Sequence, residues 1–294
     1  MKELDRVHKV IPKSEALTFL DICCCPGGFS QYILQVNHLA NGNGLSLSPP
    51  AGYQLSIKEH EFDRFQVAYQ DITRYDFYTD YMSLSDHELA TLPTPLNTLD
   101  LCPLPAVALQ DFIIADGQVL RDYNVRGAES FPSHPAGFGP YSALLYAQLV
   151  IGLIFLRPGG TFVFRTTHCD RYHTMNLIQK MQAISSVKCF KPTKCWSDRS
   201  SFYVIAKRVR TNSPECAELV RTWVQYIYYT TTRNEIPKEL SEEYGSEREQ
   251  EAIRRGEISQ LVPILKKIWK VQADGMEWKL QKRSGWRRGK AFKA

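Results

Sequence analysis

The feature that most constrains the fold is a strand that ends in a tight turn and leads straight into a helix. Residues 18–23 (TFLDIC) form a short apolar run, and a Pro-Gly-Gly turn follows at 26–28. Residues 29–39 then carry apolar side chains at helical spacing. A strand, a glycine turn and a helix in this order begin a βαβ unit, so the sequence predicts a parallel sheet covered by helices.

The same alternation continues along the chain. Residues 141–156 form an apolar helix that is too short, and too interrupted by polar residues, to span a membrane. We expect the other elements at these positions: helices at 2–16 and 171–185, and strands at 44–47, 66–69, 111–115, 161–165 and 201–207. Strands that alternate with helices predict an α/β, doubly wound sheet.

The pattern changes after about residue 209. An aromatic-rich helix is expected at 215–229, packed back on the sheet, followed by a charged helical segment at 238–257 and a basic tail. We therefore place a domain boundary at 210. This gives a sheet domain at 1–210 and a helical extension at 211–294. Residues 80–108 form a Pro- and Ser-rich insertion, and 121–140 form a loop expected over the site.

Composition excludes several classes of protein. With 44% hydrophobic residues in 294, the chain is not intrinsically disordered, and we expect no membrane partner. Its eight cysteines show no spacing typical of a zinc site, and three of them are adjacent at 23–25. We expect reduced thiols and no bound metal, hence an intracellular protein, in either the cytoplasm or the nucleus.

The charge of the chain is concentrated at its end. From 266 onwards there are ten Lys or Arg (266, 267, 270, 279, 282, 283, 287, 288, 290, 293) against Asp274 and Glu277, and aromatic residues are interleaved with them. Cations meet phosphates and flat rings stack on bases, so this pattern suits an RNA partner. A solvated basic tail held by a few aromatic anchors is an equally good interpretation.

Carboxylates lie at or near the carboxyl ends of three expected strands. Asp21 lies near the end of the first strand, Asp71 follows the third, and Asp116 follows the fourth. Ligands of open α/β sheets bind beyond the carboxyl ends of the strands. The turn after the first strand lacks the dinucleotide glycine pattern, since Cys23 stands where the backbone would approach a pyrophosphate, which argues against a nicotinamide enzyme. The loop fits a cofactor with a carboxylate and a ribose but no phosphate. Taken alone, Asp71 is better explained as a turn or cap residue.

These residues carry a family resemblance. Residues 21–32 (DICCCPGGFSQY) closely resemble the first motif of the FtsJ-like (RrmJ-type) ribose 2'-O-methyltransferases, which bind S-adenosylmethionine. The resemblance continues through 111–117 (DFIIADG), 157–165 (RPGGTFVFR) and 199–206 (RSSFYVIA), and covers roughly 2–208. It implies a Rossmann-like doubly wound sheet of the S-adenosylmethionine-dependent methyltransferase type, here with a C-terminal helical and basic extension.

The resemblance also implies a set of cofactor-binding residues. They are Asp21, Cys23, Cys24, Pro26, Gly27, Gly28, Phe29, Ser46, Asp71, Ile72 and Asp116. Methyltransferases usually place an acid after the second strand to hold the ribose hydroxyls, and this chain has Ser46 and Ser48 there instead. A hydroxyl is a weaker partner than a carboxylate, so we expect reduced cofactor affinity.

The family's catalytic Lys-Asp-Lys-Glu tetrad is only half retained. Lys2 matches the first position, with Lys9 and Lys13 as alternatives, and Asp116 matches the second. Arg165 replaces the second lysine and Ser201 replaces the glutamate. An arginine stays protonated and cannot act as a base, although it can stabilise negative charge.

Two functions remain open at this point. The first is an S-adenosylmethionine-dependent methyltransferase that acts on a ribose 2'-hydroxyl of RNA. The alternative is a weakened or inactive FtsJ-like protein that binds RNA or a protein partner. The sequence does not select an RNA or a nucleotide. His168, which follows the fifth strand, is interpreted as a surface or packing residue.

Overall fold

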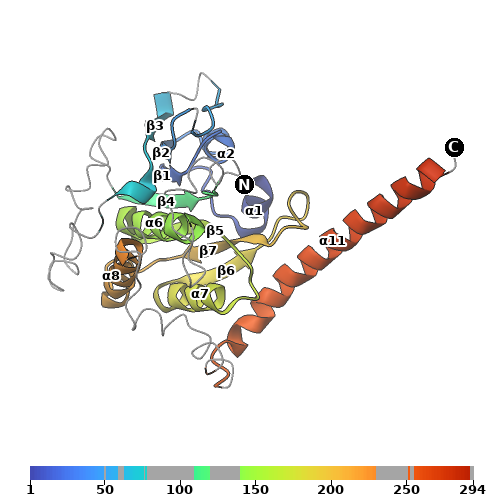
Figure 1. The fold of residues 1–294 in the computed structure, drawn as a ribbon. Helices are drawn as coiled ribbons and strands as arrows, with labels where there is room; N and C mark the ends of the chain where they lie inside the picture. Colours follow the sequence, from blue (N-terminus) through green and yellow to red (C-terminus); the bar gives the residue numbers. More distant parts are fainter. Residues whose placement is uncertain are drawn as a thin grey trace.

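The computed structural model describes residues 1–49, 51–58, 63–75, 77, 109–119, 140–229, 251 and 255–291, with backbone only at 140 and 283–291 (Figure 1). Its strands are β1 (Leu17–Ile22), β2 (Ala40–Ser46), β3 (Phe65–Tyr69), β4 (Gln110–Ala115), β5 (Leu156–Thr167), β6 (Ser186–Phe190) and β7 (Ser201–Lys207). Its helices are α1 (Lys2–His8), α2 (Gly28–Val36), α6 (Pro140–Phe155), α7 (Tyr172–Ile184), α8 (Pro214–Tyr228) and α11 (Val262–Ala291), with 3-10 turns η2 (Ile72–Arg74) and η4 (Ser259–Leu261).

The strands form one sheet in the order β3-β2-β1-β4-β5-β7-β6. The pairs from β3 to β5 are parallel, whereas β7 runs antiparallel to both β5 and β6. The α/β doubly wound fold is therefore confirmed, but the expectation of an all-parallel sheet is wrong at β7. Strand β6, which follows α7 in the sequence and forms the edge of the sheet, is not among the predicted strands. The chain reverses direction after β6, so β7 runs antiparallel to β6 and β5.

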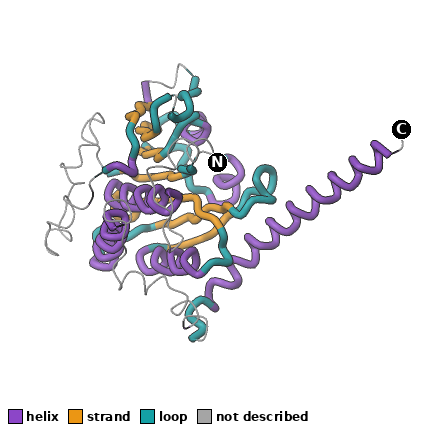
Figure 2. Tube along the Cα trace, in the orientation of Figure 1, coloured by secondary structure: helices purple, strands orange, loops and turns teal. Residues whose placement is uncertain are grey.

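Helices cover both faces of the sheet (Figures 1 and 2). Strand β1 shows why, because its side chains alternate between two hydrophobic cores. Leu20 and Ile22 face the core under α6, α7 and α8, while Leu17 and Phe19 face the core under α1 and α2. This alternation is what a strand buried on both faces requires.

Helix α8 packs on α6, as the aromatic-rich pattern predicted. The Trp223 and Tyr226 rings lie 5.9 and 4.6 Å from the Tyr146 ring, centroid to centroid. The domain boundary placed at 210 stays a prediction. Residues of α8, which follows this boundary, pack in the same hydrophobic core as residues of the sheet, which precedes it.

Some expected bounds are wrong. The first helix ends at His8 rather than 16, because Lys9 adopts a left-handed conformation (φ 49°) and the buried Asp5 carboxylate accepts the N–H groups of Val10 and Ile11. The strand expected at 161–165 is longer in the structure, where β5 spans Leu156–Thr167. The insertion 80–108, most of the loop 121–140 and most of the charged segment 238–257 lie outside the described residues.

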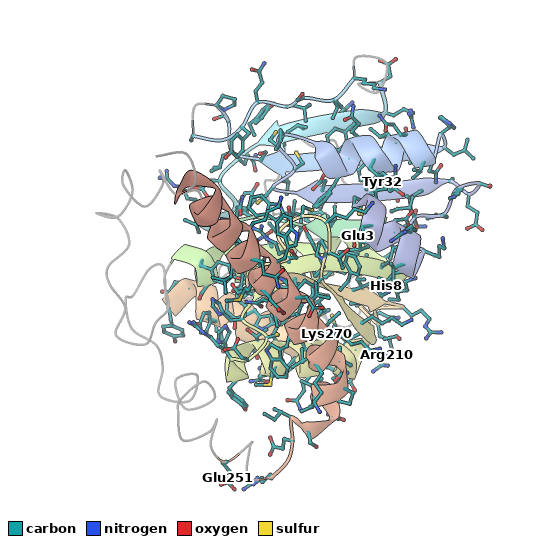
Figure 3. All side chains as sticks on the ribbon, turned by 90° about the vertical axis from the view of Figure 1, so that its right-hand side faces the viewer. Glu3, His8, Tyr32, Arg210, Glu251 and Lys270 are labelled. Carbon is teal, nitrogen blue, oxygen red and sulfur yellow. The ribbon has the colours of Figure 1, made fainter. Side chains whose placement is uncertain are left out.

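The basic tail is a helix, α11, of 30 residues. Its first turns are anchored in the core by Leu265 and Ile268. Its middle contacts the loop between β6 and β7 at Ser197 and Asp198, and the helix extends away from the sheet (Figure 1). Figure 3 shows the molecule from the side on which α11 extends, with Lys270 of this helix labelled. Among the described residues, no helix combines the length and the hydrophobicity that crossing a membrane would take.

Candidate active site

A cavity of about 320 Å³ lies at the carboxyl ends of β1, β2, β3 and β4. Its volume falls within the range of small-molecule sites. All the expected cofactor residues except Gly27 line it: Asp21, Cys23, Cys24, Pro26, Gly28, Phe29, Ser46, Asp71, Ile72 and Asp116. The strand ends bring these residues together from four separate segments of the chain, as the ligand-binding rule for open sheets predicts.

Gly27 and Gly28 have different roles in the turn. Gly27 has φ +103°, and a Cβ there would stand 2.8 Å from the Ile57 side chain, so this position requires glycine. Gly28 begins α2, and a Cβ there would meet no protein atom within 4 Å. Because Gly28 lines the cavity, a side chain at this position would enter the space available to a ligand.

Asp21 offers a free carboxylate oxygen. The side chain is only 1% exposed, and Ser30 Oγ donates to its Oδ2 at 2.6 Å. The other oxygen, Oδ1, has no hydrogen-bond partner among the described residues. Burial raises the pKa of Asp21 to about 7 against the opposing hydrogen bond of Ser30. A buried acceptor without a partner is costly, so a cationic or N–H group of a ligand would be stabilised there.

The three adjacent cysteines form one wall of the cavity. Burial raises the pKa of the Cys23 thiol to about 12. The Cys25 thiol differs: hydrogen bonds, first from Cys24 and then from Ser46 and Tyr69, outweigh its desolvation and lower its pKa to about 6. The lowered pKa of Cys25 makes it the most acidic of the three neighbouring thiols.

The end of β3 supplies a cap rather than a free acid. Asp71 Oδ1 accepts from Thr73 N at 3.0 Å and from Thr73 Oγ1 at 2.6 Å, and Arg74 Nε lies 3.5 Å from Oδ2. Asp71 is thus the cap residue that its sequence position suggested, although it also lines the cavity. Ile72 is buried beside it.

A larger groove of about 2010 Å³ meets the cavity at Phe29, Asp116 and Gln118. Lys2, Asp116, Arg165 and Ser201 all line this groove, so the structure brings the four tetrad positions to one surface. The alternatives Lys9 and Lys13 do not line it. Lys2 lies at the exposed start of α1, and Ser201 is the first residue of β7.

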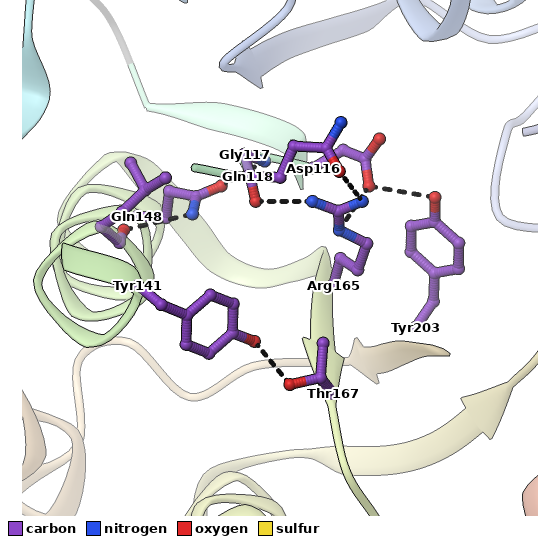
Figure 4. A network of polar contacts seen from close by, with 9 residues as sticks. Asp116, Gly117, Gln118, Tyr141, Gln148, Arg165, Thr167 and Tyr203 are labelled. Atoms are coloured by element: carbon purple, nitrogen blue, oxygen red, sulfur yellow. Dashed lines mark hydrogen bonds and ion pairs between the residues drawn. The ribbon is translucent and has the colours of Figure 1, made fainter. Parts of the chain in front are cut away.

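Asp116 is held by two side chains at the junction of cavity and groove (Figure 4). Arg165 Nε lies 3.2 Å from Asp116 Oδ1, and Tyr203 OH donates to the same oxygen at 3.0 Å. Burial raises the pKa of Asp116, with Arg165 and then Tyr203 opposing the rise. The remaining guanidinium nitrogens donate to Gly117 O at 2.9 Å and Gln118 Oε1 at 3.1 Å.

Helix α6 fixes the turn that follows Asp116. The buried Gln148 side chain accepts from Gly117 N at 2.7 Å and donates to Leu144 O at 3.1 Å (Figure 4). A Cβ at Gly117 would stand 2.6 Å from Gln148 Oε1, so this contact depends on glycine. The polar residue that interrupts the apolar helix pattern thus positions the Asp116 backbone.

Sequence reasoning missed Tyr203 and Gln148 as site residues. Tyr203 reaches the site because β7 is antiparallel and pairs Tyr203 with Arg165, a register that alternation alone does not reveal. The signal for Gln148 is that a polar residue in an otherwise buried helix needs a hydrogen-bond partner. His168 is partly exposed near Ser200 and Asp170, outside both cavities, as expected of a surface residue.

The model of the FtsJ-like methyltransferase family matches residues 1–209. The chain belongs to the FtsJ-like methyltransferase family. The resemblance found in the motifs is thereby confirmed, and so is the expected cofactor class of the FtsJ-like family, S-adenosylmethionine. The orphaned Asp21 oxygen and the open space at Gly28 fit an amino-acid-like group in the cavity.

This FtsJ-like chain is similar to cap-specific mRNA (nucleoside-2'-O-)-methyltransferase 1 of Bos taurus, with 26% identity over 69% of this chain and 23% of that protein. It is also similar to the inactive cap-specific mRNA (nucleoside-2'-O-)-methyltransferase 1B of Caenorhabditis briggsae, with 24% identity over 71% of this chain and 22% of that protein. The matched stretch is thus less than a quarter of these curated relatives.

Among solved structures, a ribosomal RNA methyltransferase from Plasmodium falciparum is 16% identical, with a TM-score of 0.44 over 71% of this chain and 94% of that chain. Human methyltransferase-like protein 13 in complex with SAH is 13% identical, with a TM-score of 0.38 over 72% of this chain and 83% of that chain.

Proposed function

We propose that this FtsJ-like chain transfers a methyl group from S-adenosylmethionine to a ribose 2'-hydroxyl of RNA. The observation that carries the proposal is that the cavity and the groove are both lined by Asp116. The cavity that suits the cofactor opens at Asp116 into a groove that contains Lys2, Arg165 and Ser201. A small molecule in the cavity and a polymer in the groove would therefore meet beside Asp116.

The groove has the charge that RNA requires. Six of its described lining residues are cationic: Lys2, Arg6, Arg74, Arg165, Lys194 and Arg199. Its two described acids, Glu3 and Asp116, are both engaged, Glu3 with Thr193 and Asp116 with Arg165. Neutralising phosphates supplies most sequence-independent affinity for nucleic acid, so this surface suits RNA. The printed names of the relatives, which refer to mRNA caps and ribosomal RNA, support the same substrate class.

The cavity residues would hold the cofactor from three sides. Asp21 Oδ1 would accept from its amino group, the backbone N–H groups at the start of α2 would face its carboxylate, and Ser46 would contact its ribose. When bound, the cofactor supplies an electrophilic methyl group on a sulfonium. Gly28 leaves the space into which the cofactor would fit.

The groove residues would orient the ribose hydroxyl. As the new O–CH₃ bond forms and the S–CH₃ bond breaks, the hydroxyl must lose its proton. Arg165 stays protonated and is bonded to Asp116, so it would stabilise the developing negative charge on the oxygen without accepting the proton. Lys2 and Asp116 are the tetrad residues able to exchange a proton at this place.

A second candidate function has its own observation. Arg165 and Ser201 replace two members of the tetrad, and one relative is named as inactive. A chain that binds RNA without methylating it would keep the cationic groove and lose the reaction.

We also propose an intracellular location, which the free thiols of all described cysteines support.

Methyl transfer is tested with S-adenosylmethionine that carries a labelled methyl group and a pool of cellular RNA. A 2'-O-methyl group blocks alkaline cleavage of the neighbouring phosphodiester, so label in alkali-resistant dinucleotides identifies the product. Asp116→Asn removes the carboxylate charge and should abolish labelling. Asp170→Asn is the matched control, because Asp170 is exposed and lies outside the groove. Label in mononucleotides, or no label from protein that binds both ligands, would contradict the proposal.

A further inference from the structure

The loop between β6 and β7, residues 191–200, forms one wall of the groove. Its Lys194, Cys195, Trp196, Arg199 and Ser200 line the same hollow as Asp116. The family motif at 199–206 includes the last two residues of this loop, Arg199 and Ser200, but none of the residues between Pro192 and Ser197. The loop therefore adds a surface of its own to the groove.

A buried lysine holds this loop from inside. Lys191 is 3% exposed, and its Nζ donates to the carbonyl oxygens of Arg199 at 2.5 Å, Ser201 at 2.8 Å and Trp196 at 3.5 Å. Burial lowers the pKa of Lys191. A buried cation bonded to three backbone carbonyls of one loop fixes the path of the backbone on which Trp196 lies.

Two helices hold the loop from outside. On one side, Glu3 of α1 accepts from Thr193 N at 3.0 Å and from Thr193 Oγ1 at 2.6 Å. On the other side, α11 lies so close that a Cβ on Gly275 would stand 2.6 Å from Ser197 Oγ, and Lys279 donates to Asp198. The loop is thus pinned between the helix that carries Lys2 and the basic C-terminal helix.

Trp196 stands on this pinned loop with its ring exposed. Its side chain is 65% exposed, and its backbone has φ +59°, a left-handed conformation that is strained for a bulky residue. The Arg199 guanidinium lies 5.6 Å from the centre of the Trp196 ring. Single exposed apolar residues are common. Trp196 differs because buried contacts hold it in place, a cation accompanies it, and it faces the hollow that contains Asp116.

We propose that Trp196 is a stacking platform for a nucleobase of single-stranded RNA bound in the groove. The inference rests on the proposed function, since it takes the polymer in the groove to be RNA. Trp196 would carry a base near the nucleotide whose ribose lies at Asp116, and Arg199 would contact the same base or its phosphate. A flat, exposed ring beside a cation suits a base and a phosphate together. Because every base has a π-face, this contact positions RNA without selecting its sequence.

Binding of short single-stranded oligoribonucleotides to the full chain, measured by fluorescence anisotropy, tests the proposal. Trp196→Ala should weaken binding by about 5- to 100-fold, the range expected for the loss of one stacked base. Trp196→Phe should retain most of the affinity, whereas Trp196→Leu should not, because leucine is apolar but cannot stack. Leu39→Ala is the control, since Leu39 is also an exposed apolar residue but lies outside the groove.

An abasic oligonucleotide of the same length separates stacking from phosphate binding. Wild type and Trp196→Ala should bind this probe with equal affinity, because it has nothing to stack. If Trp196→Ala binds base-containing RNA as tightly as wild type, the stacking site does not exist. If Trp196→Ala weakens binding of the abasic probe by the same factor, Trp196 only supports the loop.

Titration with S-adenosylmethionine and the methyl-transfer assay are run on the same proteins. Intact stacking without methyl transfer would refute the proposed function alone, and methyl transfer without a Trp196 effect would refute this inference alone.

Discussion

Arg165 on β5 and Tyr203 on β7 are directly paired residues of an antiparallel ladder, and both contact the same oxygen of Asp116. Paired residues project to the same face of a sheet, so this register places a cation and a hydroxyl beside the carboxylate at the end of β4. The register explains how arginine fits where the family has lysine. Its longer side chain extends past Asp116 and also bonds to Gly117 O and Gln118.

Restoring the family tetrad should increase methyl transfer. The double substitution Arg165→Lys with Ser201→Glu returns an ionisable amine and a carboxylate to the groove, and we expect a rise of about 10- to 100-fold in labelled RNA. Arg157→Lys is the matched control, because Arg157 pairs with Asp111 at 2.5 Å and lies outside the groove. An unchanged rate in a double variant that still binds both ligands would favour the binding-module function.

Substitutions of the two glycines of the turn should have different effects, one on stability and the other on cofactor affinity. Gly27→Ala should lower the free energy of unfolding by roughly 1 kcal/mol or more, because φ is +103° and its Cβ would clash with Ile57. Gly28→Ala should fold normally and bind S-adenosylmethionine at least tenfold more weakly, since its methyl group would enter the cavity. Thermal unfolding and calorimetric titration of both variants check this. Equal cofactor affinity of Gly28→Ala and wild type would place the cofactor elsewhere.

Cys25 should be alkylated in preference to its neighbours Cys23 and Cys24. Its pKa is lowered to about 6, chiefly by the hydrogen bond of Cys24, so its reaction with iodoacetamide should rise with pH around that value and level off near neutrality. Cys23, whose pKa burial raises to about 12, should stay unlabelled and is the internal control. S-adenosylmethionine should protect Cys25, because this residue lines the cavity. Peptide mapping after labelling gives the result, and a rate that rises only above about pH 8 would contradict it.

Asp21 should make stability depend on pH. The folded state raises its pKa from 3.8 to about 7, so the folded protein retains a proton that the unfolded chain loses. This contribution is complete below the unfolded value and is lost as pH rises through about 7. Asp21→Asn should therefore gain stability over wild type between about pH 4 and pH 7, by up to roughly 4 kcal/mol at about 1.4 kcal/mol per unit. Urea unfolding without cofactor measures the difference. A constant difference across this range would show that Asp21 ionises normally.

The sequence predicted well where local chemistry decides the structure. The turn at Gly27 and the strand end before Asp116 follow from residue type and spacing, and the family motifs carry the cofactor residues with them. The pairing of Arg165 with Tyr203 could not be predicted, because it depends on the reversal at β6 and on a register between distant strands. The shape of the loop at 191–200 could not be predicted either, because it depends on contacts with α1 and α11, which are far away in the sequence.

The most direct measurement is calorimetric titration of the chain with S-adenosylmethionine, for wild type, Asp116→Ala and the control Asp170→Asn. We predict saturable one-to-one binding by wild type and by the control, with a dissociation constant on the order of micromolar, and a loss of binding in Asp116→Ala. That result would locate the cofactor between Asp21 and Asp116. No binding by folded wild type, or equal binding by Asp116→Ala, would contradict the assignment of this cavity.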